Sequence, residues 1–197
     1  GGYRHFMEKE IHEQPDAIAH TLAAMTGPEG KLSTPLARED LAAIDGIVML
    51  AAGTSHYAAM VARYWIESLA RVPVSCEIAS EYRYRKPVTG AFSCAVAISQ
   101  SGESLDTLMA MRHAGEAGLR TIGLVNVPGS TIAREADMVM PTRAGPEIGV
   151  ASTKAFTAQL TALISFAVAL AEAKGQISVE RRDEIHAAIQ GLPSMVG

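Results

Sequence analysis

Two short segments rich in hydroxyl side chains are the part of this sequence best suited to chemistry. Gly53-Thr54-Ser55 follows an apolar run at 47–51, and Ser99-Gln100-Ser101-Gly102-Glu103-Ser104 follows another at 94–98. A sequence with helical periodicity comes directly after each segment. A helix N-terminus offers unpaired backbone N–H groups and the positive end of its dipole. The two segments therefore predict a site for an anion such as a phosphate group, held without a lysine.

The second segment supplies most of the candidate contacts. Ser99, Ser101 and Ser104 are the expected hydroxyl donors. Gly102 has no side chain, so that the backbone can approach a ligand closely. Gln100 carries an amide with a donor end and an acceptor end, which suits it to orient sugar hydroxyls.

The first segment is expected to approach the same ligand from the facing side, through Thr54 and Ser55. The competing interpretation is that these hydroxyls only cap helices, as Ser and Thr often do. One such segment would favour capping. Two of them at one point of the fold favour a ligand.

The elements that must position these segments alternate between strands and helices. Apolar runs predict strands at 47–51, 74–78, 94–98, 121–125 and 138–140, and helical spacing predicts helices at 6–25 (bent or restarted at Pro15), 36–44, 56–70, 104–117, 152–173 and 179–189. This alternation predicts an α/β fold with three layers, a doubly wound sheet of five parallel strands in the flavodoxin-like order 2-1-3-4-5. Ligands bind such sheets at the carboxyl ends of the first and third strands. The two hydroxyl segments follow those strands.

Composition excludes several classes of function. The net charge of −4 gives no basic face for general nucleic-acid binding. Cys76 and Cys94 are the two cysteines, and they are not spaced as a disulfide framework or zinc site, so a cytoplasmic protein without a metal is expected. The sequence has neither a G-x-G-x-x-G motif after its first strand nor a Walker motif, so no nucleotide cofactor is expected. The apolar stretch 155–171 is interrupted by polar residues and predicts a buried core helix, not a membrane span.

The hydroxyl segments, together with Gly149-Val150-Ala151-Ser152-Thr153-Lys154, resemble the sugar isomerase (SIS) domain family. The resemblance implies that Thr54, Ser55, Ser99, Gln100, Ser101 and Ser104 bind a sugar phosphate, that Val150 and Ser152 touch the sugar, and that Gly53 and Gly102 support the loops. Lys154 opens a helix, the wrong end of the dipole for a cation, so we expect it to be structural, with a carboxylate or packing partner.

Within that family, residues 1–15, 77–85 and 126–130 resemble enzymes that join a glutaminase domain to two SIS lobes. The resemblance implies that residues 1–30 are a linker segment and residues 31–197 the first lobe of a longer protein. That protein would make glucosamine 6-phosphate and glutamate from fructose 6-phosphate and glutamine. No catalytic residue is expected here, because the family's chemistry belongs to the second lobe and the tail. A homodimer is also expected, with Ile164, Phe166 and Val168 contributing.

Two other readings remain open at this point. The chain could come from an SIS phosphosugar isomerase or deaminase without a glutaminase domain. It could also be a sugar-phosphate sensor that binds without chemistry, although such sensors usually carry a basic DNA-binding segment, which this chain lacks.

Overall fold

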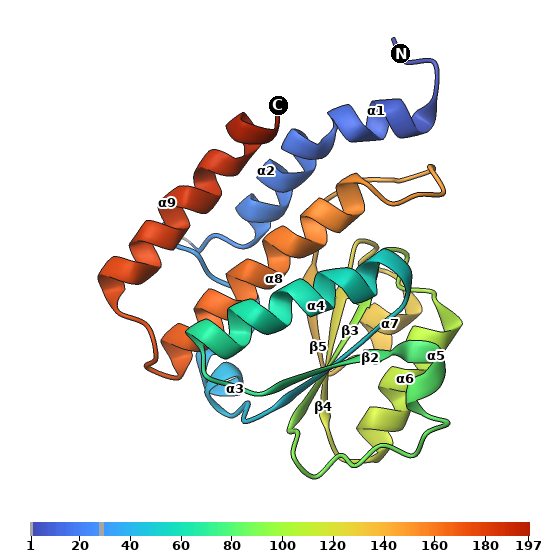
Figure 1. The fold of residues 1–197 in the computed structure, drawn as a ribbon, viewed down its shortest axis with the longest axis vertical. Coiled ribbons are helices and arrows are strands. Elements are labelled where there is room, and N and C mark those ends of the chain that lie inside the picture. The colour runs from blue at the N-terminus through green and yellow to red at the C-terminus, as the bar shows by residue number, and fades with distance from the viewer. Residues whose placement is uncertain (1, 28–29) are drawn as a thin grey trace.

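A parallel sheet of five strands lies at the centre of the chain, in the order β2-β1-β3-β4-β5 (Figure 1). The computed structural model describes residues 2–27 and 30–197. The strands are β1 (Ile47–Ala51), β2 (Val74–Ile78), β3 (Cys94–Ser99), β4 (Arg120–Val125) and β5 (Met138–Pro141). The predicted α/β fold and strand order are confirmed.

The two middle strands β1 and β3 are buried along their whole length. Both are continuous apolar runs because a strand covered on both faces has no solvent side to alternate toward. They pair in parallel register, with Leu50 beside Ala97. Their carboxyl ends therefore emerge side by side.

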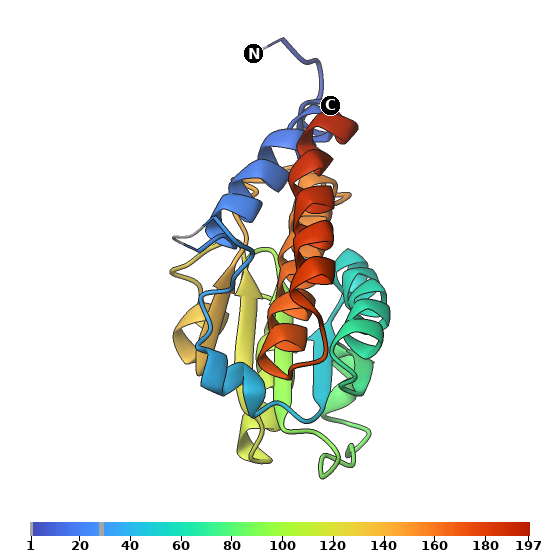
Figure 2. The ribbon, with the colours of Figure 1, turned by 90° about the vertical axis from the view of Figure 1, so that its left-hand side faces the viewer.

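Helices cover both faces of the sheet (Figures 1 and 2). One face packs against α3 (Arg38–Ala42), α4 (Gly53–Leu69) and α8 (Lys154–Ala173), and the other packs against α5 (Ala79–Tyr82), α6 (Leu105–Glu116) and α7 (Thr131–Glu135). A further pair of helices, α2 (Gln14–Ala24) and α9 (Val179–Val196), packs on the outer side of α8, and α1 (Phe6–His12) precedes α2.

α8 is apolar enough and long enough to cross a membrane by composition, with a mean hydropathy of 1.5. However, 67% of its most apolar window is buried inside the protein. The predicted core helix is confirmed. This burial also corrects one expectation about the homodimer: Phe166 and Val168 are 0% exposed within the chain, so they cannot form a subunit interface in this fold.

Several predicted boundaries were wrong. Gly53-Thr54-Ser55 is not a loop but the first turn of α4. The N–H groups of a first turn make no intrahelical bond, so apolar spacing gives no signal there. The single-turn helices α5 and α7 were not predicted, and α9 continues past residue 189 to Val196. The predicted effect of Pro15 is confirmed as a restart: α1 ends at His12, α2 begins at Gln14, and Pro15 lies in the first turn of α2, where its missing N–H costs nothing.

Candidate functional site

The segment 99–104 forms a tight turn between β3 and α6, which we call the serine loop. The buried Ser99 Oγ accepts a hydrogen bond from the Gly102 N–H at 3.1 Å. The exposed Ser101 Oγ accepts one from the Glu103 N–H at 3.2 Å. Ser104, the N-cap of α6, accepts one from the Thr107 hydroxyl at 3.1 Å. Every serine hydroxyl of the loop thus accepts a hydrogen bond from the protein itself.

Ser55, in the first turn of α4, has the same arrangement. Its Oγ accepts a hydrogen bond at 2.9 Å from Nε2 of Gln159, a residue of α8 that is 2% exposed. In the described part of the chain, residues 2–27 and 30–197, none of the four hydroxyls of Ser55, Ser99, Ser101 and Ser104 donates a hydrogen bond. Because a hydroxyl has one proton to give, these bonds leave the proton of each hydroxyl unused. Ser55, Ser101 and Ser104 are accessible to a ligand, whereas Ser99 is buried. Thr54 is exposed beside them.

Gly102 is required at its position by both backbone and space. Its φ is +66°, in the left-handed region that favours glycine. A Cβ there would lie 2.0 Å from Ser130 Oγ and 2.4 Å from Ser130 Cβ. Ser130 is buried, and its Oγ has no hydrogen-bond partner among the described residues. The predicted close approach at Gly102 is therefore an approach of the loop backbone to the protein beneath it.

The helix N-termini at this edge of the sheet differ in what occupies them. The Glu103 carboxylate accepts hydrogen bonds from the Thr131 N–H at 2.7 Å and the Thr131 hydroxyl at 2.8 Å, at the start of α7. The Thr131 hydroxyl and N–H lower the pKa of Glu103, which keeps this carboxylate charged. At the start of α8, the Glu147 carboxylate accepts from the N–H groups of Thr153 and Ala155 at 2.9 and 3.2 Å.

The helices α4 and α6 lack such a cap. The N-cap residues are Ala52 for α4 and Ser104 for α6. Within residues 2–27 and 30–197, no side chain accepts a hydrogen bond from the first N–H groups of either helix. These are the two helices that follow the hydroxyl segments. Their N–H groups and positive dipole ends stay available to an anion, while α7 and α8 already hold a carboxylate.

The remaining sequence-predicted contacts lie in the loop before α8, which we call the 145–153 loop. Val150 is fully exposed. Ser152 is not free, because its Oγ donates to Glu147 Oε2 at 3.0 Å. Gly53 has a φ of +56° and open space around it.

Asn126, directly after β4, connects this loop to the serine loop. Its backbone N–H donates to the Gln100 carbonyl at 3.1 Å, and its Nδ2 donates to the Gly145 carbonyl at 2.8 Å. Its Oδ1 accepts from the Ala144 N–H at 2.8 Å. One residue therefore links the two loops that were predicted to hold a ligand, through its backbone on one side and its side chain on the other.

Sequence reasoning missed four polar residues that support the site: Glu10, Asn126, Glu147 and Gln159. The side chains of Glu10, Asn126 and Gln159 bond to groups at least 16 residues away, which no local pattern reveals. Glu147 bonds to groups five to eight residues further along the chain. Lys154 was the exception. Its Nζ lies 2.6 Å from Glu13 Oε2, so the expected carboxylate partner is confirmed.

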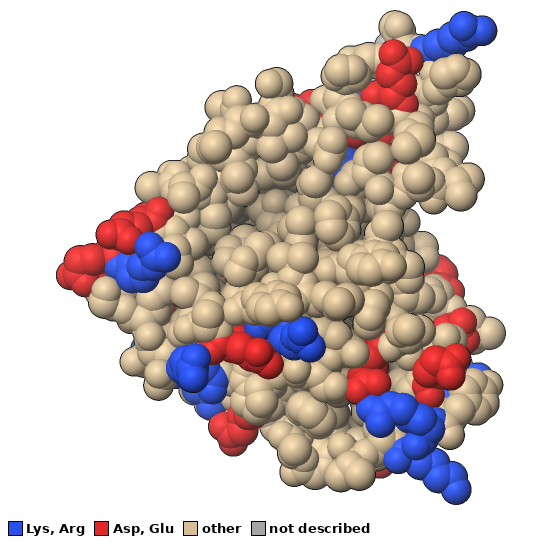
Figure 3. All heavy atoms as spheres, in the orientation of Figure 1, with Lys and Arg blue, Asp and Glu red and all other residues tan. Residues whose placement is uncertain are grey.

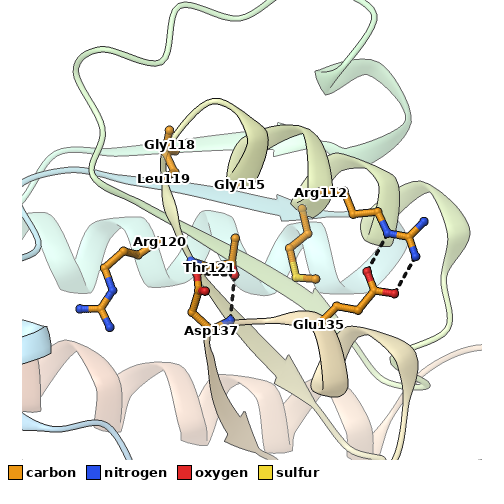
Figure 4. Close-up of a pocket in the computed structure, with 9 residues that line it drawn as sticks. Arg112, Gly115, Gly118, Leu119, Arg120, Thr121, Glu135 and Asp137 are labelled. Carbon is orange, nitrogen blue, oxygen red and sulfur yellow. Dashed lines mark hydrogen bonds and ion pairs between the residues drawn. The ribbon is translucent and has the colours of Figure 1, made fainter.

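A cavity of about 430 Å³ lies at the opposite edge of the sheet, where β4 begins (Figure 4). Its charged groups are paired with protein groups. Arg112 and Glu135 form an ion pair at 2.6 Å, and Asp137 accepts from the Thr121 N–H and hydroxyl. None of the predicted site residues lines it. Within the described residues, no group of His, Cys, Asp and Glu is arranged to hold a metal ion.

Comparison with known proteins agrees with this geometry. The sequence profile of the SIS domain matches residues 40–169, which is most of the chain. The chain belongs to the SIS domain family. The match includes the sheet, the serine loop and the start of α8.

Relatives of this SIS domain are more specific. It is 54% identical over 186 residues to the glutamine–fructose-6-phosphate aminotransferase (isomerizing) of Zymomonas mobilis, and this match covers 94% of the chain and 31% of the relative. It is 48% identical over 197 residues to the enzyme of the same name from Brucella abortus, of which it covers 32%. The chain thus spans about a third of the length of these relatives.

Solved structures match the fold. The C-terminal domain of glucosamine-fructose-6-phosphate aminotransferase from Francisella tularensis superposes with a TM-score of 0.94 at 42% identity, and the match covers 98% of this chain and 55% of that one. Glucosamine-6-phosphate deaminase from Thermotoga maritima superposes with a TM-score of 0.73 at 22% identity, which shows a shared fold alone.

Proposed function

We propose that this SIS domain is the sugar-phosphate-binding lobe of a glutamine–fructose-6-phosphate aminotransferase (isomerizing). The reaction of the parent enzyme would be L-glutamine plus D-fructose 6-phosphate giving D-glucosamine 6-phosphate plus L-glutamate. One observation carries the proposal: at the switch point of the sheet, the four hydroxyls of Ser55, Ser99, Ser101 and Ser104 accept hydrogen bonds from the protein and donate none to the residues that the structure describes.

A phosphate group suits that arrangement because its oxygens only accept when it is fully ionised. Ser55 and Ser101 donate to it from the two facing segments, with Thr54 beside Ser55. The uncapped N–H groups of α4 and α6 add to these donors. Ser99 fixes the shape of the loop through its bond to Gly102, and Ser104, which accepts from Thr107 of α6, has a proton left to donate to the ligand. No lysine or arginine is needed, because the helix dipoles supply the positive potential.

The sugar would lie between the serine loop and the 145–153 loop. Gln100 would orient sugar hydroxyls through its amide, and Val150 and Ser152 would contact the sugar from the other side. Gly53 and Gly102 support the two turns. Asn126 keeps the loops at a fixed separation through its bonds to Gln100 and Gly145.

The chemical steps would belong to parts of the parent enzyme outside this chain: a second SIS lobe and a glutaminase domain, in a homodimer in the cytoplasm. The chain would therefore bind fructose 6-phosphate and be inactive alone. The 54% and 48% identities to the aminotransferases favour this function over an isomerase, a deaminase or a sensor.

Isothermal titration calorimetry of the chain tests the proposal. Fructose 6-phosphate, glucose 6-phosphate and inorganic phosphate should bind, whereas unphosphorylated fructose should not. Ser101→Ala should raise the Kd of fructose 6-phosphate about tenfold, since a hydrogen bond to a charged group is lost.

Ser68→Ala is the matched control. Ser68 is exposed near the other end of α4, and its hydroxyl donates to the Trp65 carbonyl, so its loss should leave the Kd unchanged. Equal binding of fructose and fructose 6-phosphate, or an unchanged Kd in Ser101→Ala, would contradict the proposed phosphate site.

A further inference from the structure

The 145–153 loop has little apolar packing of its own. Ile148 is 61% exposed and Val150 is 106% exposed. A loop without buried side chains keeps one conformation only if its polar bonds define it, because ordering each residue costs backbone conformational entropy. The bonds that hold this loop therefore decide where Val150 and Ser152 lie.

Glu10, on α1, supplies the bonds at the middle of the loop. It is 2% exposed although it is a carboxylate. Its Oε1 accepts from the Ile148 N–H at 2.6 Å, and its Oε2 accepts from the Gly149 N–H at 3.0 Å. The two carboxylate oxygens thus satisfy two neighbouring N–H groups of a loop 138 residues away in the sequence.

The backbone of α1 lies directly against the same point of the loop. A Cβ added to Gly149 would lie 2.6 Å from Glu10 Oε2 and 3.6 Å from Met7 Cα. In Figure 1, α1 runs beside the loop that leads into α8. The contact is therefore a fitted one, in which glycine leaves room for the carboxylate.

Glu147 holds the end of the loop in a similar way. Its carboxylate accepts from the Ser152 hydroxyl at 3.0 Å and from the Thr153 N–H at 2.9 Å. However, Glu147 belongs to the loop and moves with it. Glu10 ties the middle of the loop to α1, whereas Asn126 ties its start to the end of β4.

We propose that Glu10 is a positioning residue of the sugar site, which holds the 145–153 loop in the shape that contacts the sugar. The site then extends into α1, outside residues 40–169 that match the SIS profile. Glu10 acts through the backbone of Ile148 and Gly149 and does not touch the ligand. This inference rests on the proposed function, because it assumes that the loop lies against a bound sugar phosphate.

Two ligands distinguish positioning from a general role in stability. The serine loop binds the phosphate group, whereas the 145–153 loop contacts only the sugar. Removal of Glu10 should therefore weaken binding of fructose 6-phosphate and leave binding of inorganic phosphate unchanged. A general loss of structure would weaken both.

Titration calorimetry with both ligands is performed on the chain, Glu10→Ala, Glu10→Gln and Glu8→Gln. We expect the fructose 6-phosphate Kd to rise about tenfold in Glu10→Ala, because two charge-assisted bonds are lost, and less in Glu10→Gln, which keeps one acceptor oxygen. Glu8 lies exposed on the same helix, so Glu8→Gln controls for the change in charge and should bind both ligands like the unsubstituted chain.

A second variant keeps the test decisive if Glu10→Ala folds poorly. Gly149→Ala places a Cβ against Glu10 and should give the same selective loss of fructose 6-phosphate binding. In the double variant with Glu10→Ala, the added Cβ meets no carboxylate, so Gly149→Ala should cost nothing further.

Three results would overturn the inference. The first is an equal rise in Kd for both ligands in Glu10→Ala. The second is an unchanged fructose 6-phosphate Kd in both Glu10→Ala and Gly149→Ala. In either case the proposed function would stand. The third is that the unsubstituted chain binds inorganic phosphate and fructose 6-phosphate equally or binds neither. That result would contradict the proposed function as well.

Discussion

Lys154 Nζ, at the first residue of α8, lies 2.6 Å from Oε2 of Glu13, the N-cap of α2. The lysine is 4% exposed, and it lies at the positive end of its helix dipole. Both its burial and its position are unfavourable for an ammonium group. The Glu13 carboxylate offsets both and joins the N-terminal segment to the start of α8.

Removing Glu13 and removing Lys154 should lower the free energy of unfolding by different amounts. Glu13→Gln leaves a buried ammonium without its partner and should destabilise the chain by about 2 kcal/mol, reduced from the full cost of a buried pair because Glu13 is partly exposed. Lys154→Met leaves only a carboxylate that can reach water and Lys9, so it should cost less. Urea unfolding of both variants measures the difference. A larger loss in Lys154→Met would contradict this assignment.

The same pair should contribute to stability in a pH-dependent way. The hydrogen bond from Lys154, and then the one from Lys9, lowers the pKa of Glu13. The folded chain therefore holds the charged carboxylate more strongly than the unfolded chain does. The stabilisation is complete above the ordinary glutamate pKa of about 4.3 and is lost as the pH falls through the lower folded value.

A double-mutant cycle of Glu13→Gln and Lys154→Met, measured between about pH 7 and pH 3, isolates this contribution. The coupling free energy should be constant from neutral pH down to mildly acidic pH and should decline in the acid range. A coupling that grew on acidification would have the wrong sign for a carboxylate with a lowered pKa.

Gly102→Ala should disrupt the serine loop. A left-handed backbone costs a non-glycine residue about 1–2 kcal/mol, and the new Cβ also meets Ser130. We expect a lower Tm and a loss of fructose 6-phosphate binding, both measured on the same preparation. Ser130→Gly removes the atoms that the Cβ would meet, so the double variant should recover the part due to the clash. No recovery would indicate that the backbone conformation alone is responsible.

The two cysteines should resist alkylation in the folded chain. Burial raises the pKa of Cys94 to about 12 and that of Cys76 to about 11. Only the thiolate reacts with iodoacetamide, so at about pH 8 both should react far more slowly than a free thiol. Mass spectrometry should find Cys76 modified before Cys94, and both modified rapidly in urea. Fast modification of Cys94 without denaturant would show that β3 opens.

The sheet could be predicted because its information is local. The two middle strands are short apolar runs, at 47–51 and 94–98, and each is followed by a turn signal and a helical pattern. The handedness of parallel crossovers and the strand order then place the carboxyl ends of β1 and β3 together. The candidate phosphate site follows from that placement, since both hydroxyl segments come directly after these strands.

The supporting residues could not be predicted, because their partners are far away in the sequence. Glu10 bonds to Ile148, and Gln159 bonds to Ser55. Glutamate on α1 has the same local pattern whether it faces solvent, as Glu8 does, or is buried, as Glu10 is. Only the partner of Lys154 could be predicted, because a lysine at the start of a helix in an apolar sequence is unfavourable and requires a partner.

The carboxylates at the starts of α7 and α8 have a consequence for where an anion can go. A phosphate that reaches this edge of the sheet meets the starts of five helices, α4 to α8, but Glu103 and Glu147 already occupy two of them with negative charge. Those two ends repel it, whereas in the described residues no carboxylate occupies the starts of α4 and α6, which hold the hydroxyl segments. The two carboxylates therefore restrict where the charge of a ligand can lie, and with it the orientation of a bound sugar phosphate.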